Sequence, residues 1–163
     1  MKKSITLLLV FVLVVSSALF GNSYNTPPDI LSVQQVLNDC MGDILLIIDY
    51  LHSSGYTSVY INDDGGTILA DSVRITIPDE EVRSVVDRLI GEKRVHFISK
   101  KDNTVILELW EGFGKDIGCG IAYTTTDNKL PDVQFATEIL PLEEINWYYY
   151  VTDYNAWRAG ERP

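Results

Sequence analysis

The chain has 163 residues, of which 46% are hydrophobic and 22% charged, and its 13 Lys and Arg against 23 Asp and Glu give a net charge of -10. This composition is typical of a globular protein and excludes disordered, collagen-like and disulfide-dense chains. The length predicts one domain. The negative charge, without any cluster of Lys and Arg, excludes nucleic-acid binding, because phosphate contacts need clustered positive side chains.

The N-terminus predicts export. Two lysines precede an apolar run over residues 5–15 and then small residues, which is the order of a secretory signal peptide. Cleavage follows either Ala18 or Ser23, so residues 1–23 are assigned to the signal peptide. The alternative is a retained membrane anchor, although the apolar stretch ends near Phe20, short of the ~20 residues of a span. The signal peptide predicts a secreted or extracytoplasmic protein. Cleavage leaves 11 positive and 23 negative charges, or -12, so the mature protein is not expected to bind anionic membranes.

The mature chain begins with a linker and a long helix. Residues 24–31 include Pro27-Pro28 and predict a linker, and residues 32–163 are assigned to a single domain. Ser32 with Gln35 matches a capping box, and apolar residues then recur at steps of three and four until Gly55. This pattern predicts an amphipathic helix with a wide buried face.

From residue 56 onward the hydrophobic period changes to two. Residues 59–61 and 73–77 predict a hairpin around an Asp-Asp-Gly-Gly turn, and Pro78 with the acids after it begins a second helix that Gly91 ends. The strands expected after it cover residues 95–99, 104–110, 117–123 and 147–152, while residues 135–142 form either a strand or a short helix. The fold class is α+β, with both helices packed on one face of an antiparallel sheet in the order α-β-β-α-β-β-β-β.

The last 45 or so residues carry a resemblance. Gly120-Ile121-Ala122-Tyr123, Leu130-Pro131-Asp132, Leu140-Pro141-Leu142 and Trp147-Tyr148-Tyr149-Tyr150 together resemble the C-terminal end of small exported bacterial proteins of unassigned function. The resemblance implies a meander of strands and no activity.

Cys40 and Cys119 are the only cysteines, and export places them where disulfides form. Cys40 lies on the apolar stripe of the first helix, and Cys119 alternates in phase with Ile117 and Ile121. Both therefore point to the same core. They form either a disulfide, which closes a loop of about eighty residues and stabilises by ~4 kcal/mol, or two buried thiols that pack as small hydrophobic side chains.

A thiol hydrolase is the catalytic alternative. Asp39-Cys40 followed by Gly42 resembles the Asp-Cys-Ser-Gly start of exported cell-wall peptidases with a papain-like fold, which implies Cys40 as nucleophile and His96 as base. Met41 stands where that motif has Ser. Cys40 also lies inside the predicted helix, not at its N-terminus, where the helix dipole would favour a thiolate.

Metal sites and cofactors are not predicted. His52 and His96 lie in no His-Glu-x-x-His sequence, and the two cysteines add no close ligand pair. We expect His52 on the surface near a helix end and His96 outward between inward Val95 and Phe97. The Asp-Asp-Gly-Gly turn lacks the final Glu of a calcium loop, where Val73 stands, so hairpin geometry explains it better.

Small residues make one face of the strand at 117–123 nearly flat. Gly118, Gly120 and Ala122 alternate there. Either a neighbouring ring such as outward-facing Trp110 lies across the glycines, or the strip is a shallow groove that a ligand or a partner's backbone approaches closely.

The aromatic end of the chain leads to the functional prediction. Tyr148 and Tyr150 share one strand face, opposite to Trp147 and Tyr149, so one pair of rings is expected to face solvent or a partner. We predict a non-catalytic binding protein whose protein or peptide partner contacts Trp110, Gly118, Gly120, Tyr148 and Tyr150. The alternatives are the thiol hydrolase and a structural or assembly protein of the cell envelope.

Overall fold

The computed structural model describes residues 26–62, 66–92, 94–111, 116–126 and 129–159, so the predicted signal peptide lies outside the described residues. The helical elements are α2 (Ile30–Ser53), α3 (Glu80–Val86), a π-helical turn (Asp87–Gly91) and α4 (Asn155–Arg158). The strands are β1 (Ser58–Ile61), β2 (Thr67–Ala70), β3 (Val73–Thr76), β4 (Phe97–Lys101), β5 (Thr104–Glu111), β6 (Ile117–Thr124), β7 (Ala136–Pro141) and β8 (Trp147–Asp153).

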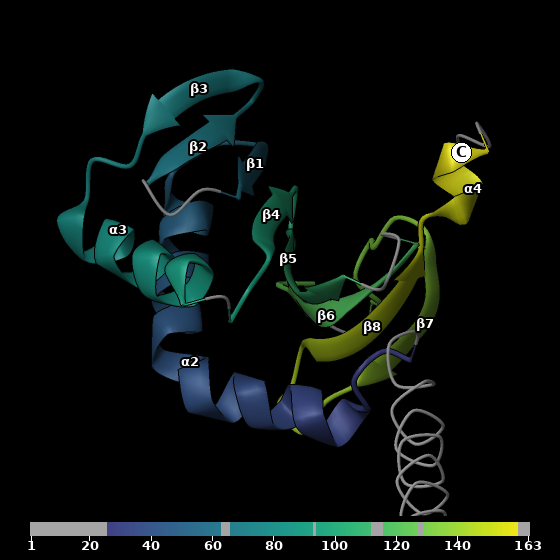
Figure 1. The fold of residues 1–163 in the computed structure, drawn as a ribbon. Coiled ribbons are helices and arrows are strands. Elements are labelled where there is room, and N and C mark those ends of the chain that lie inside the picture. Colours follow the sequence, from purple (N-terminus) through teal and green to yellow (C-terminus); the bar gives the residue numbers. More distant parts are fainter. Residues whose placement is uncertain (1–25, 63–65, 93, 112–115, 127–128, 160–163) are drawn as a thin grey trace, which may run out of the picture.

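All eight strands form one antiparallel sheet in the order β3-β2-β1-β4-β5-β6-β8-β7. The sheet curves strongly, and α2 and α3 pack on the same side of it (Figure 1). This confirms the predicted α+β class and the placement of both helices on one face. The hydrophobic core lies between the helices and this face, which we call the helix side; it includes Leu37, Ile44, Leu51, Val85, Leu89, Ile98, Leu107, Cys119, Ile121, Trp147 and Tyr149.

Helix α2 begins at Ile30, inside the segment predicted as a linker. The Asp29 carboxylate accepts a hydrogen bond from the Ser32 backbone N–H at 2.8 Å and caps the helix. Ser32 therefore lies in the first turn and does not act as the cap, and the Gln35 side chain donates to Asp39 at 2.7 Å. The apolar periodicity located the helix, whereas the capping carboxylate of Asp29 determined its first residue.

Of the described helices, α2 alone is long and apolar enough to cross a membrane. Seven of its residues are buried, and most of them belong to the core cluster shared with the sheet. In this structure α2 is therefore the core helix of a folded domain. Separately, the apolar N-terminal sequence is compatible with a signal sequence or an anchor.

The predicted hairpin contains one strand more than expected. β2 pairs with β1, and Val73–Thr76 forms a third strand, β3. Three residues of the predicted Asp-Asp-Gly-Gly turn, 63–65, lie outside the described residues. The second reversal lies at Asp71 and Ser72, which both have positive φ (45° and 69°). The Asp71 carboxylate accepts from the Ser58 backbone N–H at 2.7 Å, which holds the turn against β1. The sequence has no Asn-Gly or Asp-Gly here, so the usual signal for such a turn is missing.

The region at 135–142 adopts the strand alternative. β7 pairs with β8 and forms one edge of the sheet. Pro141 lies at its end, where the missing N–H of proline costs no sheet hydrogen bond.

Candidate functional site

The register of the sheet brings polar and aromatic residues together on the face opposite the helices, which we call the outer face. One row across β4, β5, β6 and β8 consists of Phe97, Glu108, Gly120 and Tyr150. Side chains at paired positions lie on the same face of a sheet. Residues separated by up to 53 positions in the chain therefore form one continuous surface.

The expectation that Phe97 points inward is wrong. β4 begins at Phe97, and Ile98 takes the core position on the helix side, so Phe97 lies on the outer face. Val95 is buried but precedes the strand, and its burial therefore does not set the alternation of β4. His96 is exposed, as predicted.

The glycine strip on β6 is covered by side chains of the same face. A Cβ atom on Gly118 would lie 2.5 Å from Glu108 Oε1. A Cβ atom on Gly120 would lie 2.0 Å from the backbone oxygen of Leu107 and 2.9 Å from the Tyr150 hydroxyl. The glycines thus make room for a carboxylate and a phenol. Of the two alternatives for this strip, the structure has the covered one, with Glu108 and Tyr150 as the covering side chains.

Trp110 is the ring that the sequence predicts across the glycines. Its backbone pairs with Cys119 next to a bulge in β5, between Glu108 and Trp110. Its side chain lies outside the described part of the chain. The groups that the structure does place over the glycines are those of Glu108 and Tyr150.

Glu108 is the central polar residue of the outer face. It is only 2% exposed, and its Oε2 atom accepts hydrogen bonds from the hydroxyls of Tyr154 at 2.8 Å and Tyr150 at 3.2 Å. Tyr150 is fully buried, and burial, followed by the nearby Glu108 charge, raises its pKa well above the usual value. Tyr150 therefore stays protonated and remains a donor at neutral pH.

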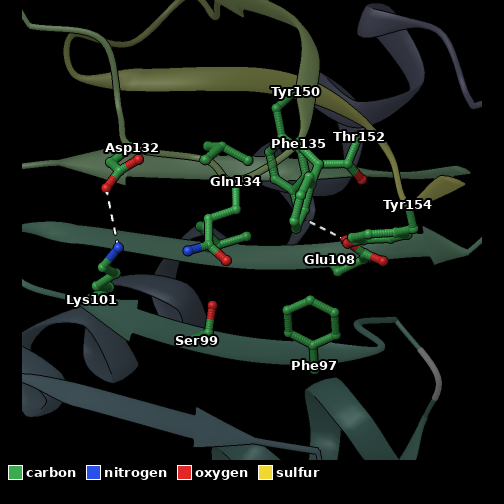
Figure 2. A pocket seen from close by; sticks show the side chains of 12 residues that line it. Phe97, Ser99, Lys101, Glu108, Asp132, Gln134, Phe135, Tyr150, Thr152 and Tyr154 are labelled. Carbon is green, nitrogen blue, oxygen red and sulfur yellow. Dashed lines mark hydrogen bonds and ion pairs between the residues drawn. The ribbon is translucent and has the colours of Figure 1, made fainter. Parts of the chain in front are cut away.

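A pocket of about 230 Å³ opens above these groups. Figure 2 shows the rings of Phe97, Phe135 and Tyr154 around it, with Glu108 beside Tyr154. Phe135 belongs to the segment before β7 and contacts the Tyr154 ring edge to face, with centroids 6.5 Å apart. The other lining residues come from strands β4, β5 and β8 and from the same segment: Ser99, Lys101, Ile106, Asp132, Val133, Gln134, Tyr150 and Thr152.

Two further polar features line the pocket. Thr152 is 2% exposed, and its hydroxyl oxygen has no hydrogen-bond partner. Since Thr152 pairs with Gly118, over which the Glu108 carboxylate lies, the hydroxyl and the carboxylate border the same space. Elsewhere in the pocket Lys101 and Asp132 form an exposed ion pair at 3.5 Å (Figure 2).

Of the five residues predicted to bind a partner, Tyr150 is among those that line this pocket. Tyr148 and Tyr150 share the outer face as predicted, yet Tyr150 is buried and Tyr148 is half-buried and does not line the pocket. The expectation of two exposed rings is wrong, because the Tyr150 hydroxyl lies over Gly120 and donates to the buried Glu108. The sequence contains one signal that points to the pocket: Glu108 is the only charged residue within the apolar stretch at 105–110. Phe135 and Tyr154 lie outside any periodic pattern.

Both cysteines are free thiols, so the structure contains no disulfide between them. Cys119 is fully buried, and burial, with a smaller effect of the Glu108 charge, raises its pKa to about 12. Cys40 is partly buried and packs against the core, where burial raises its pKa. The alternative of two thiols that pack as hydrophobic side chains describes this arrangement.

The structure does not bring Cys40 and His96 together. The pocket next to Cys40 is lined by Asp39, Asp43, Arg88, Leu89, Glu92 and Arg94. Cys40 lies near the middle of α2, far from the helix N-terminus. The other histidine, His52, was expected at the surface; it is half-buried with an unpartnered Nε2, and burial, then Lys100, lowers its pKa.

Among the residues that the structure describes, no group of three or more His, Cys, Asp and Glu could hold a metal ion. No protein-family model, no curated protein and no solved structure matches the chain.

Proposed function

We propose that the protein is an exported, non-catalytic binding protein that takes up a small ligand in the outer-face pocket. The observation that carries the proposal is a carboxylate buried in an aromatic pocket beside a hydroxyl that has no partner. Ligand sites typically combine apolar walls, which supply contact area, with a few polar groups that fix orientation. The signal-peptide pattern of residues 1–23 supports export.

Two observations favour binding over thiol catalysis. Burial raises the pKa of the Cys40 thiol and so disfavours the thiolate that a nucleophile needs. The pocket around Cys40 is lined by charged side chains and Leu89, and His96 is not among the residues that line it. That a protein or peptide partner binds the outer face stays a prediction, as does a structural role in the cell envelope.

The test uses the protein purified after expression with its own leader, isotope-labelled for NMR. Three probes of one shape and different charge are titrated separately: benzylammonium, benzyl alcohol and benzoate. We expect at least one to shift the amide signals of the pocket residues. Binding of none of the three would overturn the proposal.

A pocket-filling variant supplies the control. Ser99→Trp places a ring inside the pocket, whereas Leu140→Trp places one on the exposed edge strand β7. The first should abolish the shifts and the second should leave them unchanged. Equal shifts in Ser99→Trp and the unchanged protein would place binding elsewhere and contradict the proposal.

A further inference from the structure

The charged side chains of the outer-face pocket already have partners within the chain. Among its described lining residues, Glu108, Asp132 and Lys101 carry charge. The Glu108 carboxylate accepts hydrogen bonds from the hydroxyls of Tyr150 and Tyr154, and Glu108 takes part in a further interaction as well. Lys101 forms an ion pair with Asp132 at 3.5 Å. None of these three groups therefore depends on a ligand for a partner.

A ligand with a charge of its own would lose hydration in this pocket without gaining a dedicated counter-charge. Moving a charged group out of water is costly unless an oppositely charged, hydrogen-bonding group compensates it. The exposed pair of Lys101 and Asp132 supplies little compensation, and the Glu108 carboxylate is engaged by the tyrosine hydroxyls. An uncharged ligand avoids this cost, so the lining favours an uncharged molecule.

Phe135 has an unusual backbone conformation at the wall of the pocket. Its φ of 59° lies in the left-handed region, which bulky side chains rarely adopt. The Asp153 backbone N–H donates to the Phe135 carbonyl oxygen at 3.0 Å and holds this conformation. Strained residues cluster at ligand sites, where the surrounding structure maintains them. The strain at Phe135 places an aromatic ring at the pocket and so points to a role of that ring in binding.

The three rings of the wall come from separate parts of the fold. Phe97 lies on β4, Phe135 before β7 and Tyr154 after β8, and they surround the space above Glu108 (Figure 2). Aromatic rings prefer edge-to-face or offset contacts, and Phe135 and Tyr154 already pack edge to face. A flat ring of a ligand extends this arrangement and buries a large apolar area. The wall therefore favours an aromatic ligand.

Thr152 is the second, independent observation. Its side chain lines the pocket and is 2% exposed, and its hydroxyl oxygen has no hydrogen-bond partner. A buried hydroxyl in this state has lost its hydrogen bonds to water and gained none in return. Rotation about the Cα–Cβ bond gives the hydroxyl three staggered positions, so it can turn toward a ligand. Because a hydroxyl both donates and accepts, an uncharged hydroxyl group of the ligand suits it.

We propose that the outer-face pocket binds an uncharged aromatic ring that carries a hydroxyl group, with the ring against the aromatic wall and the hydroxyl against Thr152. The inference rests on the proposed function, since it names the ligand class of the same pocket. Such a ring comes either from a free phenol or aromatic alcohol, or from a tyrosine side chain of a partner.

The experiment compares the dissociation constant of benzyl alcohol with those of benzylammonium and benzoate, which have nearly its shape but carry a charge. We expect benzyl alcohol to bind at least about tenfold more tightly than either charged probe, because only the charged probes pay for desolvation of an ion. Equal or tighter binding of a charged probe would overturn this inference while leaving the proposed binding function intact. Absence of binding by all three would overturn both.

Cyclohexylmethanol tests whether the ring must be aromatic. It keeps the hydroxyl and the six-membered ring of benzyl alcohol but has no π-system, so it should bind several-fold more weakly. Equal affinity of the two alcohols would contradict the role of the aromatic wall.

Two matched glycine variants test the ring of Phe135. Phe135→Gly removes the ring and relieves the left-handed conformation, and it should weaken binding of benzyl alcohol at least about tenfold. Ser72→Gly relieves an equally unusual φ of 69° in an exposed turn outside the pocket and should leave binding unchanged. Equal affinities in the two variants would contradict the proposal. If Phe135→Gly does not fold, the comparison of the charged and uncharged probes on the unchanged protein still decides.

Thr152→Val gives a readout that a purely structural hydroxyl would not produce. The change is nearly isosteric, so it should weaken benzyl alcohol binding several-fold while leaving the unfolding midpoint in urea unchanged or higher. Thr76→Val, on the exposed edge strand β3, should leave binding unchanged. Unchanged affinity in Thr152→Val would overturn the placement of the ligand hydroxyl.

Two further probes separate the sources of the ring. p-Cresol is a free phenol, whereas N-acetyl-tyrosine methylamide presents the same ring within a peptide backbone. Equal affinity of the two assigns a tyrosine side chain of a partner, and tighter binding of p-cresol assigns a free phenol. Absence of binding by both, with benzyl alcohol bound, would overturn the phenol as a ligand.

Discussion

The two faces of the sheet differ in the kind of side chain that they bury. On the helix side, aliphatic side chains of α2 and α3 interlock with those of the strands and exclude water. On the outer face, the sheet buries Glu108, Tyr150 and Thr152 beneath a pocket with aromatic walls. Burial of apolar groups stabilises a fold directly, whereas burial of polar groups does so only when they are paired. One face therefore provides stability, while the other carries groups suited to recognition.

The largest expected effect tests this division directly. Leu37→Ala on α2 creates a cavity in the fully buried helix side and should lower the free energy of unfolding by ~2–5 kcal/mol. Ile106→Ala on the outer face removes a half-buried side chain and should cost about 1 kcal/mol or less. Urea unfolding measures both. Equal losses would mean that the outer face is as much a part of the core as the helix side.

Alkaline pH should weaken the helix side. Burial raises the pKa of Cys119 from 9.0 to about 12 and that of Tyr149 from 10.0 to about 12. In the unfolded chain these groups ionise at their usual values, so the folded chain holds more protons between pH 9 and 12. The free energy of unfolding therefore decreases as pH rises through this window, by up to about 4 kcal/mol for Cys119.

Urea unfolding at several pH values across this window measures the decrease. Cys119→Val keeps an apolar side chain at the position but removes the ionisable thiol. The variant should therefore show a smaller loss of stability at high pH than the unchanged protein. An identical pH dependence in both proteins would refute the contribution of this thiol.

The two glycines of β6 should respond differently to alanine. In Gly120→Ala the new methyl group meets a backbone oxygen at 2.0 Å, which only a displacement of β5 can relieve. In Gly118→Ala it meets the end of the Glu108 side chain at 2.5 Å, which can rotate away. We expect a loss of ~3 kcal/mol or more for the first and ~1–2 kcal/mol for the second. Chemical denaturation measures both, and the reverse order would contradict the geometry of the strip.

The tyrosine hydroxyls sharpen the comparison within the outer face. Tyr150→Phe removes a buried donor to a carboxylate and should cost ~1.5–3 kcal/mol, because Glu108 loses one of its hydrogen bonds. Tyr154 is only half-buried, so water can replace its hydroxyl, and Tyr154→Phe should cost less despite its shorter bond. Thermal unfolding of the two variants at one pH ranks them.

The smallest effect concerns the first turn of α2. Asp29→Ala removes the helix cap and should destabilise the protein by about 1 kcal/mol. Ser32→Ala removes a hydroxyl that does not cap the helix and should change stability by less than ~0.5 kcal/mol. A larger loss in Ser32→Ala, measured by urea unfolding, would favour the capping box that the sequence suggests.

Local patterns determined most of the architecture. The steps of three and four residues in α2 and the alternation in β6 and β8 each specify which side chains enter the core, because the period of an element decides which residues share a face. Pro78 and the acids after it likewise located α3, where the Asp79 carboxylate accepts from two backbone N–H groups. Such features need only neighbours in the chain.

Tertiary structure alone decided the site. The register places Glu108 beside Gly120 and Tyr150, and the segment before β7 brings Phe135 to Tyr154, although nothing local to these residues encodes the pairing. The state of the cysteines was decided in the same way, since a shared orientation toward the core does not bring two thiols within bonding distance. Alternation along a strand determines the face on which a side chain lies. The long-range pairing of strands determines which residues it contacts on that face.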